Sequence, residues 1–275
     1  MKKWNAKNVM NTLPERKTDA HKGTYGTALI AAGSRFMPGA AVLSAIACMR
    51  SGVGKLEVGT EESVIPYIIQ HLPETTFVPG FYERLESLSF DQYRVLAAGP
   101  GREADDETEQ TVKTFLSTNL PVILDAGALS KRTYSKRKAP TILTPHPGEF
   151  LRISGCSKEE LEENRQVTVT EFAKESGVTV VLKGKKTLTA FPDGEIYENT
   201  TGNSALSKGG TGDTLTGMIT GMICCHEDWK HAILNAVYLH GASADEWIKK
   251  KSAHAMLARE INDLLPEVWK NFEKK

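Results

Sequence analysis

Short apolar segments alternate with helical patterns along most of the chain, and this alternation limits the possible fold. The segments at 27–32, 94–98, 121–125 and 178–182 are apolar on successive residues rather than on every second residue. A strand of that kind has both faces buried, which is typical of a parallel sheet covered by helices. The sequence therefore predicts an α/β fold of three layers, with helices on both faces of a mostly parallel central sheet.

Hydrophobic periodicity, together with turn and cap residues, predicts the individual elements. We expect strands at 27–32, 55–58, 94–98, 121–125, 141–144 and 178–182. We expect a hairpin that pairs 187–191 with 195–198, because Pro192-Asp193-Gly194 is a strong turn signal. We expect helices at 38–51, 63–71, 105–117, 158–176, 211–225, 229–250 and 255–271.

No internal repeat, low-complexity tract or long linker divides the sequence. We therefore expect one domain spanning residues 1–275. The segments between the early strands are too short to build a second sheet, so we expect no separate lid. The basic run at 131–138 is interpreted as a solvated loop.

The composition excludes several classes of function. The 275 residues carry a formal net charge of zero, which gives no electrostatic footprint for nucleic acid or for an anionic membrane. No apolar run approaches the roughly 20 residues that span a bilayer. The N-terminus lacks the apolar region of a signal peptide, and none of the four cysteines forms a C-x-x-C pair. We expect a cytoplasmic protein with reduced thiols.

Glycine-rich polar segments follow the predicted strands. They are Gly33-Ser34, Gly99-Pro100-Gly101, Asp125-Ala126-Gly127, His146-Pro147-Gly148-Glu149 and Lys183-Gly184. In parallel sheets the ligand crevice lies outside the carboxyl ends of the strands, so these segments should meet at one rim. This pattern favours an α/β enzyme with a phosphate site.

The stretch at 203–220 carries the strongest signal of such a site. Gly209, Gly210 and Gly212 surround Thr211 and lead into Asp213, where a helical pattern begins. Glycine-rich backbone entering a helix N-terminus binds anions, because free N–H groups and the helix dipole favour negative charge. Asp213 is open to two interpretations: a helix N-cap, or a general base for a hydroxyl that attacks a phosphate.

Other candidate residues also have two interpretations each. The two prolines around His146 predict a constrained loop that holds His146 and Glu149 at the rim; alternatively a helix begins there, with Pro147 in its first turn. The small residues at 39–41 suit either close approach of a phosphate or helix packing. The segment at 183–187 is either a nucleotide contact or a solvated basic turn. His240 is interpreted as a surface residue or a satisfied core residue rather than a ligand.

Taken together, these segments resemble the ribokinase-like superfamily and, more narrowly, the NAD(P)H-hydrate dehydratases, repair enzymes formerly classified as carbohydrate kinases. The resemblance covers about residues 18 to 255. The matching motifs are H-K-G-T-Y-G at 21–26, A-A-G-S-R-F-M-P-G-A-A at 31–41, A-A-G-P-G at 97–101, L-D-A-G-A-L at 124–129, L-T-P-H-P-G-E at 143–149, V-L-K-G at 181–184 and G-N-S-A-L-S-K-G-G-T-G-D at 202–213. The chain departs from the family at Gly127, where an aspartate is usual, and in the pattern at 204–208.

The resemblance implies a reaction that repairs hydrated NADH and NADPH. A phosphoryl group is transferred from ADP, or from ATP in animal relatives, to the ring hydroxyl of the (S)-hydrate. The ring nitrogen then expels phosphate, and loss of a proton restores the reduced nicotinamide. Mg²⁺ accompanies the nucleotide.

The resemblance also implies roles for individual residues. Asp213 would be the base, and the backbone N–H groups of Gly210, Thr211, Gly212 and Asp213 would form the anion hole. The hydrated dinucleotide would contact Ala40, Ala41, Gly101, His146 and Asp213. The adenine nucleotide would contact Lys183, Gly184, Lys185, Lys186, Thr187 and Gly212. Glu149 falls where sugar kinases carry a glutamate that orders magnesium-bound water.

Two other functions fit the same motifs. One is a kinase for a small alcohol, such as a thiazole alcohol or a sugar, which would use the same phosphoryl-transfer residues. The other is a non-catalytic nucleotide-binding regulator, although an intact Asp213 argues against it. The resemblance further implies a homotetramer and a separate epimerase in the same pathway.

Overall fold

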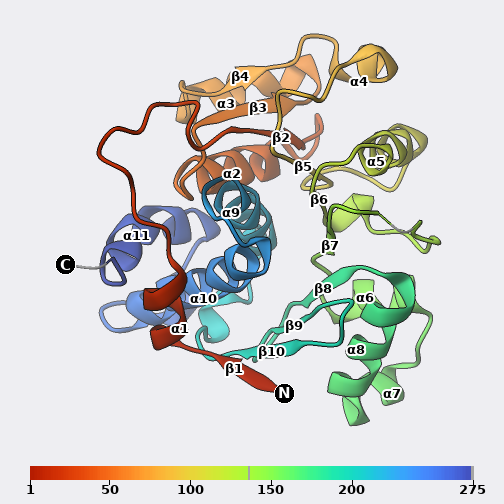
Figure 1. Ribbon diagram of the computed structural model, residues 1–275. Helices are drawn as coiled ribbons and strands as arrows, with labels where there is room; N and C mark the ends of the chain where they lie inside the picture. The colour runs from red at the N-terminus through yellow and green to blue at the C-terminus, as the bar shows by residue number, and fades with distance from the viewer. Residues whose placement is uncertain (136, 274–275) are drawn as a thin grey trace.

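The computed structural model describes residues 1–135 and 137–273. Lys136, in the basic run, lies outside the described residues. Within them the strands form one ten-stranded sheet in the order β1-β10-β9-β8-β7-β6-β5-β2-β3-β4 (Figure 1). The strands are β1 Lys2–Trp4, β2 Thr27–Ala31, β3 Lys55–Gly59, β4 Thr76–Phe77, β5 Val95–Ala98, β6 Val122–Leu124, β7 Thr141–Leu143, β8 Thr179–Leu182, β9 Leu188–Ala190 and β10 Ile196–Asn199.

Strand direction follows the expectation from the apolar segments. From β4 to β8 every neighbouring pair is parallel, and β9 is antiparallel to both β8 and β10. The predicted hairpin is thus confirmed. The short strand β1 pairs in parallel with β10 at the sheet edge. Since all ten strands share one sheet, the described residues form no second sheet that could serve as a lid.

Helices cover both faces of the sheet (Figure 1). One layer contains α1 Ala6–Thr12, α2 Pro38–Met49, α3 Ile65–His71, α9 Thr211–Cys225, α10 Trp229–Ile248 and α11 Ala258–Lys270. The other contains α4 Phe81–Arg84, α5 Asp106–Ser117, α6 Pro147–Ser154, α7 Lys158–Glu163 and α8 Arg165–Ser176. This is the predicted three-layer α/β architecture.

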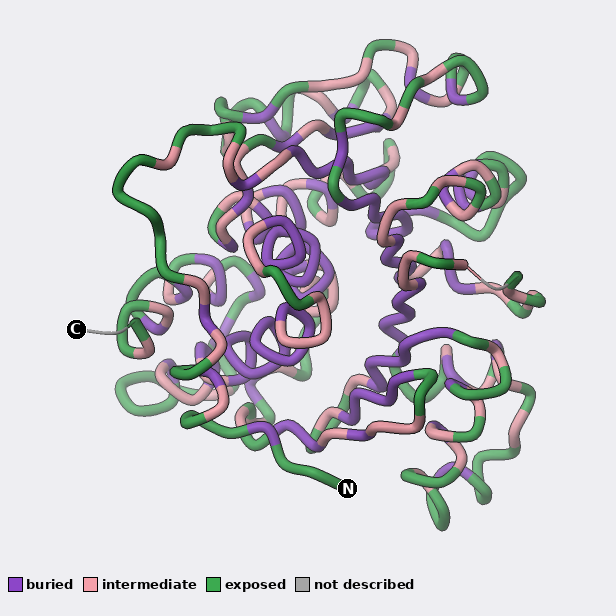
Figure 2. Tube along the Cα trace, in the orientation of Figure 1, coloured by how far each residue is buried: buried purple, intermediate pink, exposed green. Residues whose placement is uncertain are grey.

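The alternation of side chains along the strands divides the core in two. In β2, Ala28 and Ile30 pack into the layer of α9, whereas Leu29 and Ala31 pack into the layer of α5. All four are fully buried, which explains why the strand is apolar at every position. Figure 2 shows the sheet buried along its centre and α9 buried along most of its length.

Close packing of α2 against α9 fixes the two helix N-termini that reach the rim. A Cβ on Gly217 would lie 2.1 Å from the carbonyl oxygen of Ser44, and one on Gly221 would lie 2.3 Å from that of Cys48. Any larger side chain at either glycine would push the helices apart. The small residues inside α9 therefore serve helix packing.

Several predictions of element boundaries were wrong. The helix expected at 158–176 is two helices, because Asn164 adopts a non-helical conformation (φ −126°, ψ 33°) between α7 and α8. The elements β1, α1, β4 and α4 were not predicted; they span two to seven residues each, too few to establish a period. Trp4 anchors β1 by donating from Nε1 to Asn235 Oδ1 over 3.0 Å.

All four cysteines are free thiols, in agreement with the sequence-based expectation. Among the described residues, no helix is both long and apolar enough to cross a membrane.

Candidate active site

The glycine-rich stretch forms the turn that starts α9. Gly210 is the N-cap, with a positive φ of 92°. A Cβ there would lie 2.6 Å from Leu43 Cδ1 on α2, so both backbone conformation and space require glycine. Asp213 is the third residue of the helix, and its side chain makes no capping hydrogen bond. The N-cap interpretation of Asp213 is therefore wrong.

The start of α9 offers free backbone donors. Within the described chain, no protein acceptor pairs with the amides of Gly210, Gly212 or Asp213, whereas the Thr211 amide makes only a long bond of 3.5 Å to the carbonyl of Lys208. Three unpaired N–H groups at the positive end of a 15-residue helix make an anion site. Of the four amides predicted to form the anion hole, those of Gly210, Gly212 and Asp213 are thus free of protein acceptors, whereas that of Thr211 is weakly engaged.

Asp213 lies half-buried among other charged groups. Burial raises the pKa of its carboxyl to about 7; the carboxylates of Asp125 and Glu149 act in the same direction, whereas Lys183 opposes them. A carboxyl with a pKa near neutrality is suited to general-base catalysis, because it is substantially ionised yet still basic at the working pH.

Asp125 is a site residue that the sequence placed at the rim without a role. It follows β6, and its side chain is only 2% exposed. Its Oδ1 accepts from Lys183 Nζ over 2.8 Å, and its Oδ2 accepts from Thr216 Oγ1 on α9 over 2.8 Å. A Cβ on Gly127 would lie 2.1 Å from the carbonyl of Arg102, so a larger residue does not fit there.

Lys183 follows β8 and lies beneath the turn at Gly212. Its Nζ is 3.9 Å from Glu149 Oε2 and 3.1 Å from where a Cβ on Gly212 would be. Burial lowers the pKa of this amine, but Asp125 and Glu149 more than offset it, so its pKa stands above the usual value. The ammonium is thus charged and shared among carboxylates at the edge of the anion site.

His146 and Glu149 lie at the start of α6, so of the two interpretations of this segment the helix start holds rather than the constrained loop. His146 is the N-cap, and Pro147 is the first helical residue. Glu149 Oε2 accepts from the His146 amide over 2.8 Å, while His146 Nδ1 accepts from the Glu149 amide over 3.2 Å. This reciprocal pair leaves the His146 side chain 57% exposed at the rim, within reach of a ligand.

The segment at 183–187 lines a cavity of about 580 Å³ beside the start of α9. Every residue predicted to contact the nucleotide lies in its wall: Lys183, Gly184, Lys185, Lys186, Thr187 and Gly212. The opposite wall was not predicted; it includes Asn203, Leu206, Leu215, Val237 and Gly241. The cavity's polar and apolar walls together suit an adenine nucleotide.

Two further residues support this cavity. Arg165, at the start of α8, donates to the carbonyls of Lys185 (3.0 Å) and Lys186 (3.3 Å) and so fixes the turn, in which Lys186 has a positive φ of 57°. His240 Nε2 lies 2.9 Å from the carbonyl of Thr211. Burial lowers the pKa of His240 to about 4, so the ring is neutral and carries its proton on Nε2. Of the two predicted interpretations, a surface residue or a satisfied core residue, the second holds, although His240 also lines the cavity.

Three of the five residues predicted to contact the dinucleotide, Ala40, Ala41 and Gly101, lie around the N-terminus of α2, whereas His146 starts α6 and Asp213 lies in α9. A Cβ on Gly101 would lie 2.7 Å from Ala40 Cβ and 2.7 Å from the carbonyl of Met37. Ala41 is only 1% exposed, and its Cβ would lie 2.8 Å from a Cβ on Gly33. Ala41 therefore has the packing role that the sequence left open, whereas Gly39 and Ala40 are partly accessible.

Comparison with known proteins shows which family builds such a site. The sequence model of the family described as NAD(P)H-hydrate dehydratase matches residues 28–267. The chain belongs to the NAD(P)H-hydrate dehydratase family. The resemblance inferred from the motifs is confirmed.

Three family relatives are close in sequence or structure. The ADP-dependent (S)-NAD(P)H-hydrate dehydratase of Bacillus subtilis is 54% identical, over 98% of each chain. The crystal structure of the ADP/ATP-dependent NAD(P)H-hydrate dehydratase from that organism, co-crystallized with ATP/Mg²⁺, superposes with a TM-score of 0.96 over 99% of each chain. The bifunctional NAD(P)H-hydrate repair enzyme Nnr of Moorella thermoacetica is 34% identical over 96% of this chain, which spans 53% of that enzyme.

Proposed function

We propose that the chain is a carbon–oxygen lyase, an ADP-dependent (S)-NAD(P)H-hydrate dehydratase that restores NADH and NADPH. The observation that carries the proposal is Asp213: a half-buried carboxyl with a pKa of about 7, beside the unpaired amides of a helix N-terminus and the nucleotide cavity. A protein that only bound nucleotides would gain nothing from a carboxylate at an anion site. Membership of the NAD(P)H-hydrate dehydratase family supports the hydroxyl of the hydrated nicotinamide ring as the group on which Asp213 acts.

In this mechanism Asp213 accepts the proton of the ring hydroxyl. The hydroxyl oxygen then attacks the terminal phosphorus of ADP, and AMP leaves. The lone pair of the ring nitrogen expels inorganic phosphate, and a proton leaves the neighbouring ring carbon. The balance is hydrate plus ADP giving reduced nicotinamide dinucleotide, AMP and phosphate. Phosphorylation replaces hydroxide, a poor leaving group, with phosphate.

The residues around Asp213 stabilise the charge that develops during transfer. The amides of Gly210, Gly212 and Asp213 point from the helix start, and Thr211 completes the turn. One well-placed donor of this kind contributes about 3 kcal/mol to a transition state. The ammonium of Lys183 adds a positive charge beneath the same turn.

We propose that Mg²⁺ binds together with the nucleotide. Among the described residues, no group of three acidic, His or Cys side chains is arranged to ligate a metal directly. Mg²⁺ commonly keeps several waters and binds phosphates with one or two carboxylates, which fits Glu149 acting through water. When bound, the ion would neutralise charge on the phosphates.

We further propose that His146 contacts the hydrated dinucleotide, together with Ala40 and Gly101, because its ring is exposed at the rim. His146→Ala should raise KM for the hydrate by about tenfold while KM for ADP changes less than about twofold, the loss expected for one ligand contact. Steady-state kinetics with each substrate varied in turn measure both values. An equal rise in both would remove His146 from the dinucleotide site.

The proposed function is tested by absorbance at about 340 nm, where reduced nicotinamide absorbs and its hydrate does not. The purified protein is mixed with confirmed (S)-NADH hydrate, Mg²⁺ and either ADP or ATP. We expect a nucleotide-dependent rise that is faster with ADP. No rise with either nucleotide would refute the dehydratase function.

Three further proposals accompany this function. Residues 1–275 act as a single domain in the cytoplasm, where the coenzymes are used. A separate epimerase supplies the (S)-hydrate. The active form is a homotetramer, as the resemblance to the family suggests.

A further inference from the structure

Arg102 is a buried guanidinium at the rim with no role in the mechanism described above. It directly follows Gly101, and its side chain is 5% exposed. Carboxylates of Glu61, Asp105 and Glu107 surround it. Arg102 Cζ lies 4.4 Å from the centre of the Tyr82 ring.

These contacts leave the guanidinium unable to bind a phosphate. Nε donates to Thr108 Oγ1 over 3.4 Å, and the two terminal nitrogens donate to Glu61 and Glu107. Three carboxylates exceed the single positive charge, so the cluster is not an anion site. Arg102 therefore acts by holding neighbouring groups in place rather than by binding a ligand.

One of these groups is the backbone of the turn between β2 and α2. Arg102 Nη1 donates to the carbonyl of Gly33 over 3.3 Å, and the Gly33 amide donates to the carbonyl of Pro100 over 2.8 Å. The β5–α5 loop thus holds both polar groups of Gly33. Gly33 lies two residues after the end of β2 and directly before the turn at 34–37.

Glu61 extends the contact to the far side of the same turn. Its Oε1 pairs with Arg102 over 3.1 Å, while its Oε2 accepts from the amide of Arg35 over 3.1 Å. Within the turn, the Met37 amide donates to the carbonyl of Ser34 over 3.0 Å. The carbonyl of Met37 in turn abuts Gly101, 2.7 Å from where a Cβ on that glycine would be.

We propose that Arg102 is a positioning residue for the dinucleotide half of the site, holding the turn at 34–37 and the N-terminus of α2 against Gly101 through Gly33 and Glu61. The proposal rests on the proposed function, since it concerns the same substrate. The nucleotide half is built from the segment at 183–187 and the start of α9. Within the described residues, none of the hydrogen bonds or ion pairs of Arg102 reaches that half.

The test compares Arg102→Met and Arg102→Lys with wild type. Arg102→Met should raise KM for the hydrate at least about tenfold and leave KM for ADP within about twofold, because only one half of the site loses its support. Arg102→Lys keeps the positive charge but lacks the forked guanidinium, so its KM for the hydrate should lie between those of wild type and Arg102→Met. Equal changes in both KM values, or an unchanged KM for the hydrate, would overturn the proposal.

A second measurement does not depend on activity. Hydrogen exchange should show faster exchange of the Arg35 and Met37 amides in Arg102→Met, and calorimetric titration should show unchanged ADP affinity. Unchanged exchange at both amides would overturn the proposal even if the dehydratase assay succeeds. Conversely, the wild type could prove inactive as a dehydratase while the two amides still exchange faster in Arg102→Met. That result would refute only the proposed function.

Arg137→Met provides a matched control. Arg137 is also partly buried, and it donates to the carbonyls of Thr118 (2.8 Å) and Leu120 (2.7 Å) near the amino ends of β6 and β7, at the opposite edge of the sheet. This variant should lose stability without changing the ratio of the two KM values. A change in that ratio in Arg137→Met would show that general destabilisation produces the effect.

Discussion

Asp213→Asn should reduce turnover of the hydrate by at least about 10²-fold, the loss typical of a missing general base. Asparagine has the same shape but cannot accept the hydroxyl proton at neutral pH. ADP affinity should remain nearly unchanged, because the amides of the anion site belong to the backbone. Turnover is measured by the rise of nicotinamide absorbance, and ADP affinity by calorimetric titration. Unchanged turnover would remove Asp213 from the mechanism.

The same substitution should leave the fold intact or stabilise it. The Asp213 carboxyl has its pKa raised from 3.8 to about 7 by burial and by Asp125, so its ionised form is disfavoured in the folded state. Its contribution to stability is present below about pH 4 and is lost as the pH rises through about 7. At pH 8 the variant should therefore gain stability, by at most about 4 kcal/mol. Chemical denaturation at pH 5 and pH 8 tests this, and a clear loss at pH 8 would contradict the charge environment described.

The sequence predicted the fold well where the elements are long and apolar. Strands β2 and β5 are buried on both faces, so their composition alone indicated a parallel sheet. Helix α9 was placed at its observed bounds because glycines precede an uninterrupted apolar pattern. The edge strand β1 could not be predicted in this way, because its three residues acquire an inward face only beside β10.

The sequence predicted those parts of the site that are formed by a single continuous segment. The segment at 183–187 and the turn before Asp213 are local motifs, and the structure places residues of both in the wall of one cavity. Asp125 and Arg102 act through partners 58 and 69 residues away in sequence, Lys183 and Gly33. Such contacts arise only when several strands end at the same rim. The signal that the sequence offers for Asp125 is a carboxylate placed directly after an apolar strand.

Lys183→Met should reduce turnover by about 10²-fold or more, because the ammonium supports the anion site and preorganised charge is a large catalytic term. Methionine keeps the length of the apolar stem but removes the charge. The Asp125 carboxylate, 2% exposed, would then retain only Thr216 as a partner. Removing one member of a buried ion pair costs about 3 kcal/mol of stability, which a urea titration measures.

The pH profile separates this electrostatic role from simple destabilisation. Burial and Asp125 raise the pKa of Asp213, whereas Lys183 lowers it. The base must be ionised, so kcat/KM should rise with pH through the pKa of Asp213. Removing Lys183 raises that pKa, so the acidic limb of the kcat/KM profile should move to higher pH. Asp125→Asn removes a carboxylate and should move the limb to lower pH. Shifts in the same direction would contradict the proposed coupling.

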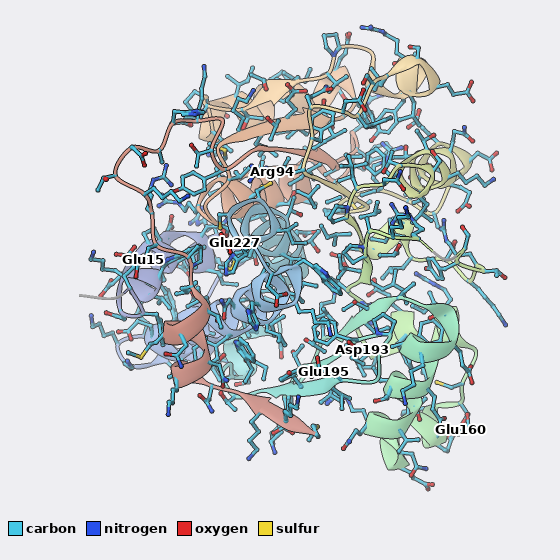
Figure 3. The ribbon with its side chains drawn as sticks, viewed as in Figure 1. Glu15, Arg94, Glu160, Asp193, Glu195 and Glu227 are labelled. Atoms are coloured by element: carbon cyan, nitrogen blue, oxygen red, sulfur yellow. The ribbon has the colours of Figure 1, made fainter. Side chains whose placement is uncertain are left out.

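Lys230→Met is the matched control for Lys183→Met. Lys230 also lies between two carboxylates, and its side chain is 25% exposed. These carboxylates, Asp193 and Glu195, belong to the β9–β10 turn (Figure 3). Because these carboxylates are accessible to water, the loss of Lys230 should cost no more than about 1 kcal/mol of stability. The acidic limb of the kcat/KM profile should stay in place. A shift of the limb in Lys230→Met would mean that any lost lysine alters the profile. The opposite shifts in Lys183→Met and Asp125→Asn, with none in the control, would establish that the two residues set the basicity of Asp213.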